Sequence, residues 1–413
     1  MEFNRVVVLG LGYIGLPTAA LLASRGIEVV GVDVNQQVVD TVNQGAIHII
    51  EPDLDILVQG SVHAGKLRAT TQPEEADVFL VAVPTPFKEG NKPDLKYIES
   101  AAEMMAPVLK AGDLVVLEST SPVGATEQLS GWLAGHRPDL RFPKPGGEAG
   151  DVFIAHCPER VLPGNVIREL VENDRVIGGL TPRCSEVASA FYRLFVRGEC
   201  VTTDSRTAEL VKLSENAYRD VNIAFANELS LICEPLGIDP WELVRLANRH
   251  PRVNILQPGP GVGGHCIAVD PWFIVSSAPE QARLITEARR VNDGKPHYIV
   301  DKIRAAIKDM SSPRVALLGL SYKADIDDLR ESPSMDIVLE LVRDPVKLMV
   351  VEPNISQCPE PLAAFDNLEF HSLESALEKA DVLAFLVRHK PFMSIDKALL
   401  KDKLVLDYCG LFS

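Results

Sequence analysis

Four apolar segments near the start of this chain recur in the same order near its end. Residues 6–11 and 315–320 are both apolar runs that end in Gly-Leu, and residues 30–35 and 349–354 both end in an acidic residue, one further residue and Asn. The other two pairs are 76–83 with 380–387 and 113–117 with 403–407. Short apolar runs separated by helical stretches are typical of parallel strands buried on both faces. The repetition therefore predicts two doubly wound, Rossmann-like α/β domains.

The region between the two repeats is predicted to be helical. Residues 205–236 contain few helix breakers, and apolar residues recur at helical spacing for about eight turns. These positions are Leu210, Leu213, Ala217, Val221, Ala224 and Phe225, with Glu228 interrupting the pattern. We expect a first α/β domain at 1–204, a central helical region with a catalytic loop at 205–310, and a second α/β domain at 311–413. So long a helix favours a homodimer, and a single core helix in a monomer is the alternative.

Composition narrows the class of protein. The chain has 413 residues, enough for two or three domains, and a net charge of −16. Such an acidic chain is not expected to bind nucleic acid or a membrane surface. The seven cysteines form no CxxC pair, so we interpret them as reduced thiols of a cytoplasmic protein, and no metal site is expected.

The uncharged segment 6–24 resembles a signal peptide or a membrane span at first reading. Three glycines, Pro17 and the pattern that runs from Arg5 to Asp33 instead favour a buried strand at 5–9, a tight turn and a helix at 14–25.

The turn after the first strand has the spacing of a dinucleotide-binding fingerprint. Gly10, Gly12 and Gly15 open the helix, and Asp33 ends the second strand about 20 residues later. A carboxylate there accepts hydrogen bonds from the adenosine ribose and repels a 2′-phosphate, which favours NAD over NADP. The second domain has Ser321 and Lys323 after Gly319, so we do not expect it to bind a dinucleotide in the same way.

A glycine-rich segment at 259–271 carries the second candidate site. Cys266 follows Gly263, Gly264 and His265, and Asp270 comes four residues later. Glycines let a ligand lie against bare backbone, and a thiolate in such a loop can act as a nucleophile. The loop alone leaves a buried, inert thiol equally open. Cys157 ends a strand-like run, which favours a structural role for it.

Basic residues gather in loops and on one helix face. Lys212, Asn216 and Arg219 are spaced for a single helix face, where Lys212 could hold an oxyanion or exchange a proton, or simply meet solvent. The basic loop 249–252 is open to the same two interpretations. Together with Arg160, Lys323 and Arg330, these residues suggest a diphosphate ligand.

Longer motifs identify the chain as similar to the UDP-glucose/GDP-mannose dehydrogenase family. They are residues 10–15, 83–86, 118–124, 157–160, 212–216, 248–261, 261–270 and 327–333. The resemblance implies an enzyme that oxidises carbon 6 of a nucleotide sugar twice with NAD, and it makes residues 1–204 the NAD-binding domain and 311–413 the nucleotide-sugar-binding domain.

The resemblance also implies roles for individual residues. Cys266 would attack an aldehyde intermediate to form a thiohemiacetal and then a thioester, Lys212 and Asn216 would surround the oxyanion, and Asp270 and Glu159 would handle water. The residues implied for NAD are Gly10, Gly12, Tyr13, Ile14, Gly15, Asp33, Thr85, Thr120, Thr126 and Arg330. Those implied for the substrate are Arg160, Val161, Lys212, Asn216, Arg219, His250, Arg252, Gly263, Tyr322 and Lys323, with His250 and Arg252 reaching the site of a neighbouring subunit.

The sequence leaves several nucleotide sugars open as the substrate. Within the family, the resemblance carried by residues 248–261 and 327–333 implies UDP-N-acetyl-D-mannosamine as the substrate, and it implies a product used in surface polysaccharide synthesis. The alternatives are UDP-N-acetylglucosamine, UDP-glucose and GDP-mannose, because pocket shape decides a single stereocentre. A non-catalytic sensor of NAD and nucleotide sugar is an alternative of another class. The chain also departs from the family at Cys409, where the family has Arg or Lys, which puts in doubt a contact of that cation.

Overall fold

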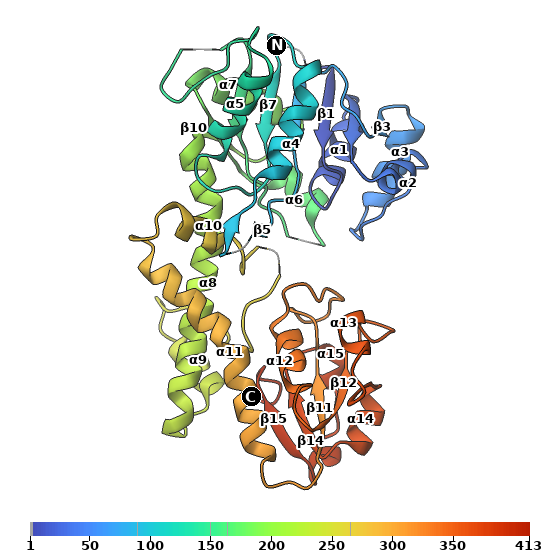
Figure 1. Ribbon diagram of the computed structural model, residues 1–413, viewed down its shortest axis with the longest axis vertical. Helices are drawn as coiled ribbons and strands as arrows, with labels where there is room; N and C mark the ends of the chain where they lie inside the picture. The colour runs from blue at the N-terminus through green and yellow to red at the C-terminus, as the bar shows by residue number, and fades with distance from the viewer. Residues whose placement is uncertain (1–2, 89, 149, 163, 265) are drawn as a thin grey trace. The chain divides into compact units, whose positions relative to one another are not determined.

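The computed structural model describes residues 3–88, 90–148, 150–162, 164–264 and 266–413 (Figure 1). The chain divides into two compact units. The N-terminal unit comprises Met1–Glu215 and Trp272–Ala278, and the C-terminal unit comprises Asn216–Pro271 and Pro279–Ser413.

The N-terminal unit is built on an eight-stranded sheet with the order β10-β9-β8-β7-β4-β1-β2-β3. The strands are β1 (Arg5–Leu9), β2 (Glu28–Val32), β3 (Leu67–Thr70), β4 (Val78–Val81), β7 (Leu114–Leu117), β8 (Phe153–His156), β9 (Arg175–Gly179) and β10 (Cys200–Asp204). All neighbours are parallel except β8 and β9, which run antiparallel. A short antiparallel pair, β5 (Phe87–Lys88) and β6 (Lys92–Pro93), lies outside this sheet.

Helices cover both faces of this sheet, because alternate residues of each buried strand point to opposite sides. Val6 and Val8 belong to one apolar core and Val7 and Leu9 to the other. The first core takes residues from α1 (Gly15–Ser24), α2 (Gln36–Asn43), α3 (Leu54–His63), α6 (Val166–Glu172) and α7 (Pro182–Tyr192). The second takes residues from α4 (Lys96–Met105), η1 (Ala106–Val108) and α5 (Ala125–His136).

The uncharged segment 6–24 is confirmed as a strand, turn and helix, since it forms β1, which contributes to both cores, and α1, which packs in the first. Among the described residues, no helix combines the length and apolar character needed to cross a membrane.

The long helix is confirmed at the predicted residues, as α8 (Ser205–Leu236). The boundary between the two units falls inside it, between Glu215 and Asn216. Its predicted apolar face is partly wrong. Leu213, Ala217 and Ala224 are buried, whereas Leu210 and Phe225 are exposed because no part of the chain that the structure describes packs over them. The other central helices are α9 (Pro240–Ala247), α10 (Asp270–Ser277) and α11 (Arg283–Ile307).

The C-terminal unit contains the second doubly wound sheet, with five parallel strands in the order β13-β12-β11-β14-β15. They are β11 (Arg314–Leu318), β12 (Lys347–Val351), β13 (Leu368–Phe370), β14 (Val382–Phe385) and β15 (Leu404–Asp407). The surrounding helices are α12 (Pro333–Leu341), α13 (Glu360–Ala363), α14 (Leu373–Lys379), α15 (Lys390–Met393) and η2 (Lys397–Leu400). The predicted α/β fold with two Rossmann-like sheets and a long central helix is therefore confirmed.

Candidate functional site

The glycine turn after β1 has the geometry of a phosphate-binding loop. Gly10 has a φ of 91°, and a Cβ there would lie 2.6 Å from the Ala82 carbonyl oxygen. A Cβ on Gly15 would overlap the Gly10 carbonyl, so both positions require glycine for packing. A Cβ on Gly12 would meet nothing within 4 Å. The bare backbone of Gly12 is thus open to a ligand, as the dinucleotide fingerprint requires.

Asp33 ties the end of β2 to this turn. Its Oδ2 accepts a hydrogen bond from the Leu11 amide at 3.1 Å, and its Oδ1 accepts one from the Asn35 amide at 2.9 Å. The carboxylate therefore lies against the turn that would hold the pyrophosphate. Binding of the ribose by Asp33 remains a prediction.

Thr85 lies at the topological switch point of the first sheet. Its loop follows β4, and the glycine turn follows the neighbouring strand β1, so both lie at the carboxyl ends where ligands bind in such folds. The Thr85 hydroxyl is buried, and no hydrogen-bond partner for it is found within the described part of the chain. A buried, unsatisfied hydroxyl in the loop next to the glycine turn fits a bound NAD, which would supply the missing partner.

Of the other residues implied for the cofactor, Tyr13 is exposed, Ile14 and Thr120 are half-buried, and Thr126 is buried. Thr126 donates to Glu209 Oε1 through its amide at 2.8 Å and its hydroxyl at 2.6 Å, and the Gly124 amide donates to Oε2 at 2.6 Å. Glu209 comes from α8, and burial raises the pKa of its carboxyl. The side chain of Thr126 is thus bonded within the protein, at the start of α5.

Glu159 lies in a buried polar cluster at the end of β8. Its Oε2 accepts from Arg175 Nη1 at 2.5 Å, and its Oε1 accepts from the Arg160 amide at 2.7 Å. Arg175 is 1% exposed and also donates to the Leu170 carbonyl at 2.9 Å. Both carboxylate oxygens of Glu159 are therefore fixed by the protein.

Two further members of this cluster are Glu118 and Tyr192, whose hydroxyl donates to Glu118 Oε1 at 2.5 Å. Burial, reinforced by the charge of Glu159, raises the pKa of Glu118 to about 7. Cys157 is also here, and burial raises the pKa of its thiol. The predicted structural role of Cys157 agrees with its burial. The sequence contained no signal for Arg175, Glu118 or Tyr192 as a group.

Lys212 is half-buried on the part of α8 that belongs to the N-terminal unit. One turn away, Glu215 pairs with Arg160, with Arg160 Nη2 at 2.6 Å from Glu215 Oε1 and Nε at 3.1 Å from Oε2. Arg160, implied for the substrate, is therefore held by a carboxylate that sequence reasoning had missed.

Cys266 is exposed, in a turn that leads into α10. Its carbonyl accepts from the amides of Val269 at 3.1 Å and Asp270 at 2.9 Å, so the thiol and the Asp270 carboxylate are one helical turn apart. Asn216, from α8, donates through Nδ2 to Asp270 Oδ2 at 2.5 Å, and both residues are buried. The structure thus brings three catalytic candidates together in the C-terminal unit. His265 lies outside the described residues.

The glycines before Cys266 are needed because this loop packs directly on the second α/β domain. A Cβ on Gly264 would lie 2.9 Å from the ring of Tyr322, and one on Gly263 would lie 2.6 Å from Tyr322 Cβ. The Gly264 amide donates to the Arg330 carbonyl at 3.3 Å. At the other end of the loop, Asn227 of α8 accepts from the Gly259 amide at 2.9 Å. The loop that carries the thiol is therefore held at both ends.

The remaining candidates lie at the surface. Arg219, His250, Arg252, Lys323 and Arg330 are exposed, and Val161 is half-buried. Arg330 pairs with Asp328 at 2.6 Å. Cys409 is half-buried, and its amide donates to Asp407 Oδ1 at 3.1 Å.

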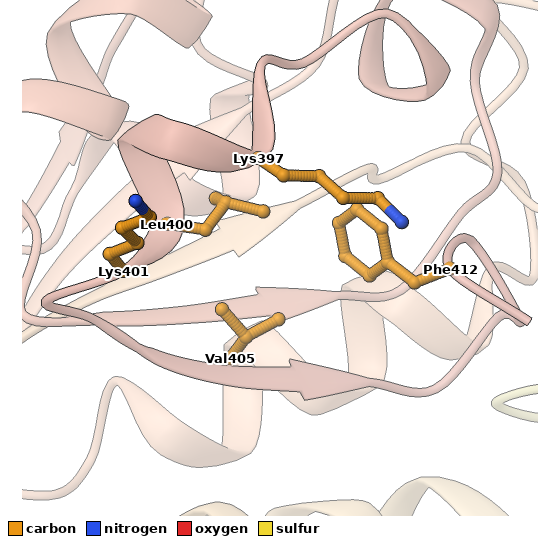
Figure 2. A pocket seen from close by; sticks show the side chains of 5 residues that line it. All are labelled: Lys397, Leu400, Lys401, Val405 and Phe412. Atoms are coloured by element: carbon orange, nitrogen blue, oxygen red, sulfur yellow. The ribbon is translucent and has the colours of Figure 1, made fainter.

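A surface pocket of about 290 Å³ lies beside β15 in the C-terminal unit (Figure 2). It is lined by Lys397, Leu400, Lys401, Val405 and Phe412, none of which is a predicted site residue. No group of acidic, histidine or cysteine side chains able to hold a metal occurs among the described residues.

Comparison with known proteins extends over almost the whole chain. Residues 4–196 match the NAD-binding domain of the UDP-glucose/GDP-mannose dehydrogenase family, residues 206–294 its central domain and residues 316–413 its UDP-binding domain. These matches define an NAD-dependent dehydrogenase. The chain belongs to the UDP-glucose/GDP-mannose dehydrogenase family, and it oxidises a UDP-sugar. The expected family, enzyme class and cofactor are confirmed.

Individual relatives are similar over their full lengths. An NDP-N-acetyl-D-galactosaminuronic acid dehydrogenase from Ralstonia nicotianae is 61% identical over 414 residues, which cover 100% of this chain and 97% of the relative. A UDP-N-acetyl-D-mannosamine dehydrogenase from Campylobacter jejuni is 60% identical, with 98% and 99% covered. The solved structure of a UDP-D-ManNAc dehydrogenase from Pyrococcus horikoshii has a TM-score of 0.87 at 38% identity, with 99% and 96% covered.

Proposed function

We propose that this enzyme oxidises carbon 6 of UDP-N-acetyl-D-mannosamine twice, giving UDP-N-acetyl-D-mannosaminuronate. The observation that carries the proposal is the exposed Cys266 thiol, one turn from the buried Asn216–Asp270 pair. The similarity to a Campylobacter jejuni enzyme named for this substrate supports the choice of sugar.

The proposed chemistry is two oxidations around a covalent intermediate. The turn at Gly10, Gly12 and Gly15 would hold NAD, which would supply hydride acceptance; each of the two oxidations would use a fresh NAD, with NADH released in between. The alcohol first loses a hydride and a proton to become an aldehyde. The Cys266 thiolate then adds to the aldehyde carbon, and loss of a second hydride from this thiohemiacetal leaves a thioester. Water adds to the thioester, the carbon–sulfur bond breaks, and the carboxylate product and the thiol are released.

Asn216 and Asp270 have complementary roles in this scheme. The Asn216 amide nitrogen carries two hydrogens, and one of them is donated to Asp270. The second hydrogen can be donated to the oxyanion that forms during attack on carbon 6. Asp270 is within one turn of the thiol and can accept a proton from the attacking water.

Lys212 and Glu159 keep the roles that the family resemblance implies, as the cation for the oxyanion and a second water-handling carboxylate. Buried Arg175 holds Glu159 in a fixed orientation, which suits a positioned base. The other residues implied for NAD and for the substrate remain proposals of the same kind, and so do the domain boundaries 1–204, 205–310 and 311–413.

Two measurements on the purified enzyme test this proposal. Two NADH per sugar consumed are expected, and a ratio of about one with free aldehyde would contradict the thioester. Turnover on a panel decides the sugar. The panel includes UDP-N-acetyl-D-mannosamine, UDP-N-acetylglucosamine, UDP-glucose, GDP-mannose and, because of the Ralstonia relative, UDP-N-acetylgalactosamine. A sensor would bind both ligands and form no NADH.

A homodimer is part of the proposal, and an exposed apolar stripe on α8 supports it. Tyr218, Phe225 and Ile232 are spaced seven residues apart and are 70%, 52% and 47% exposed. A spacing of seven keeps side chains on one helix face, so a second copy could cover them together. Phe225→Glu should convert the dimer to a monomer in light scattering, whereas Glu228→Gln, an exposed change on the same helix, should not.

The cytoplasmic location and the use of the product in surface polysaccharide synthesis also remain proposals. The seven cysteines, all within the described chain, form no disulfide, which agrees with a reducing compartment.

A further inference from the structure

His389 lies at the switch point of the second sheet, between the two loops where a nucleotide is expected. The loop after β11 begins at Gly319 and carries Tyr322 and Lys323, and His389 ends the loop after the adjacent strand β14. Ligands of doubly wound sheets bind between such loops, outside the carboxyl ends of the strands. His389 itself is 0% exposed, so it does not face the ligand directly.

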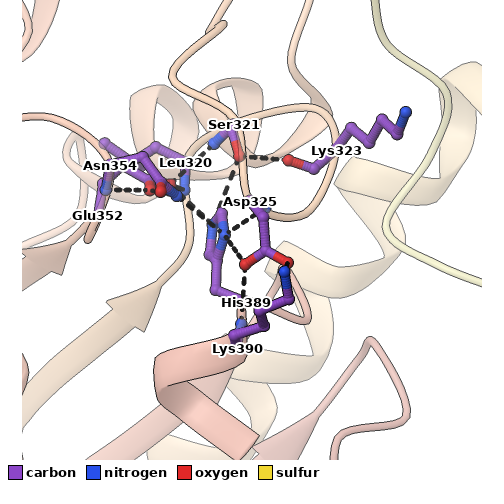
Figure 3. Close-up of polar contacts among 8 residues, drawn as sticks. All are labelled: Leu320, Ser321, Lys323, Asp325, Glu352, Asn354, His389 and Lys390. Atoms are coloured by element: carbon purple, nitrogen blue, oxygen red, sulfur yellow. Dashed lines mark hydrogen bonds and ion pairs between the residues drawn. The ribbon is translucent and has the colours of Figure 1, made fainter. Parts of the chain in front are cut away.

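Both ring nitrogens of His389 are hydrogen-bonded, to the loop after β11 and to residues that follow β12 (Figure 3). Nδ1 accepts from the backbone amide of Asp325 at 2.9 Å and from the Asn354 side-chain amide at 3.1 Å. Both groups can only donate, so Nδ1 is unprotonated and the ring proton is on Nε2. Nε2 then donates to Glu352 Oε2 at 3.0 Å. The imidazole is therefore neutral and in one fixed tautomer.

Two of the partners of His389, Glu352 and Asp325, anchor the loop after β11. Glu352 accepts from the amides of Leu320 at 2.8 Å and Ser321 at 3.1 Å. Burial raises the pKa of Glu352, but the hydrogen bonds from His389 and the backbone amides outweigh burial and hold it below its ordinary value. Asp325 has a φ of 61°, which is unfavourable for a residue with a side chain, and its Oδ1 accepts from the Lys390 amide at 2.9 Å.

Lys323 lies between these anchored positions. Its carbonyl accepts from the Ser321 hydroxyl at 2.7 Å, while its ammonium points away from the His389 cluster (Figure 3). Tyr322 packs against Gly264 of the Cys266 loop. The loop thus carries the exposed cation of Lys323 and the ring of Tyr322. Hydrogen bonds from its backbone to His389 and Glu352 fix its conformation.

We propose that His389 is a positioning residue for UDP, because its Nδ1 lone pair fixes the loop that presents Tyr322 and Lys323 to the nucleotide. This inference rests on the proposed contact of Tyr322 and Lys323 with the substrate. His389 sets the affinity for the nucleotide and takes no part in the chemistry at carbon 6.

Two substitutions test the roles of the two ring nitrogens of His389 separately. His389→Asn keeps an acceptor close to the position of Nδ1, so it can still bind the Asp325 amide. His389→Gln keeps a donor close to the position of Nε2, so it can bind Glu352 but not the Asp325 amide. The control with neither group is His389→Phe. Titration with UDP alone measures the affinity, and thermal unfolding identifies variants that fold.

For the folded variants, His389→Gln and His389→Phe should weaken UDP binding by about tenfold, the effect of losing about 1.4 kcal/mol. His389→Asn should remain within about threefold of the wild type. The Michaelis constant for the sugar should follow the UDP affinity, whereas kcat and the affinity for NAD should not change. The proposal would be overturned if all variants bound UDP with equal affinity. It would also be overturned if His389→Asn bound UDP more weakly while His389→Gln kept the wild-type affinity.

Hydrogen exchange of the ligand-free protein tests whether His389 fixes the loop, independently of whether Tyr322 and Lys323 contact UDP. Amides 320–325 should exchange faster in the Gln and Phe variants than in the wild type and the Asn variant. If this difference appears while UDP affinity is unchanged, the loop is held by His389 but Tyr322 and Lys323 do not bind UDP. No difference in exchange among the variants would show that His389 does not fix the loop.

Discussion

Asp33 and Glu352 make the same backbone contacts in the two Rossmann-like domains. Each follows the second strand of its sheet and accepts from the amide after the first strand's glycine, Leu11 at 3.1 Å and Leu320 at 2.8 Å. Each also accepts from the amide of an Asn two residues later, at 2.9 and 3.0 Å. Asp33 remains partly exposed, whereas Glu352 is buried and bonded to His389. At this position the second domain thus has a buried acid where the first has a partly exposed one, which agrees with the prediction that it does not bind a dinucleotide in the same way.

Replacement of Cys266 by Ser should separate the two oxidations. A hydroxyl is a weaker nucleophile and a poorer leaving group than a thiolate at neutral pH, so overall turnover should be nearly abolished. NADH formation in a single turnover should not exceed one per site. Cys266→Ala is the matched control without any nucleophile. Near-normal turnover of the Ser variant would exclude Cys266 as the nucleophile.

The two glycines of the turn should respond differently to an added methyl group. Gly12→Ala has open space, so the protein should fold normally and the Michaelis constant for NAD should rise about tenfold, or about 1.4 kcal/mol. Gly15→Ala places the methyl group on the Gly10 carbonyl and should lower the melting temperature even without NAD. Normal NAD affinity in Gly12→Ala would mean that the cofactor does not approach this backbone.

Glu118 should make the protein less stable as the pH rises. Its pKa is raised from 4.5 to about 7 in the fold, so between these values the unfolded state loses a proton that the folded state keeps. Stability should fall across this window, by about 3 kcal/mol in total. Glu118→Gln keeps an acceptor for Tyr192 and should remove this dependence, which makes its stability relative to the wild type greater at pH 8 than at pH 5.

Denaturant unfolding at both pH values measures this effect. The exposed Glu103 of α4 provides a control, since Glu103→Gln should leave the pH dependence unchanged. A Glu118→Gln variant with the same pH dependence as the wild type would show that Glu118 ionises normally in the fold.

Arg252 should supply positive charge to the diphosphate of the substrate. Arg252→Ala should raise the Michaelis constant for the sugar nucleotide by about 10- to 100-fold, or about 1.4 to 2.8 kcal/mol, the range for a lost charge-assisted hydrogen bond. Lysine should restore little of this, because it cannot donate two parallel hydrogen bonds. Because Arg252 is exposed in the single chain, the substitution should leave the melting temperature unchanged.

Mixed dimers test whether Arg252 acts on the neighbouring subunit. If it does, mixing Arg252→Ala with Cys266→Ala subunits should restore activity at low substrate, since one site then has both an intact arginine and an intact thiol. No recovery after verified subunit exchange would show that Arg252 serves its own subunit or that sites are not shared.

The sequence predicted those features that depend on local patterns. The strand repeats and the bounds of α8 could be found because burial on both faces and helical periodicity are visible in neighbouring residues. Cys266 and Asp270 are four residues apart, so their proximity was also accessible. The pairs Glu118–Tyr192 and Thr126–Glu209 are 74 and 83 residues apart, and no periodic pattern connects them. Exposure of Phe225 likewise depends on what covers α8, which a helical pattern does not contain.

Because a single cysteine is exposed, this enzyme can be labelled selectively at one thiol. All seven cysteines are described, and Cys266 alone is exposed, while burial raises the pKa of the Cys157 and Cys409 thiols and slows their reaction with alkylating reagents. One equivalent of iodoacetamide per chain should therefore titrate the thiol at 266 before any other. The number of labelled chains would then count competent active sites in a preparation, independently of which sugar the enzyme prefers.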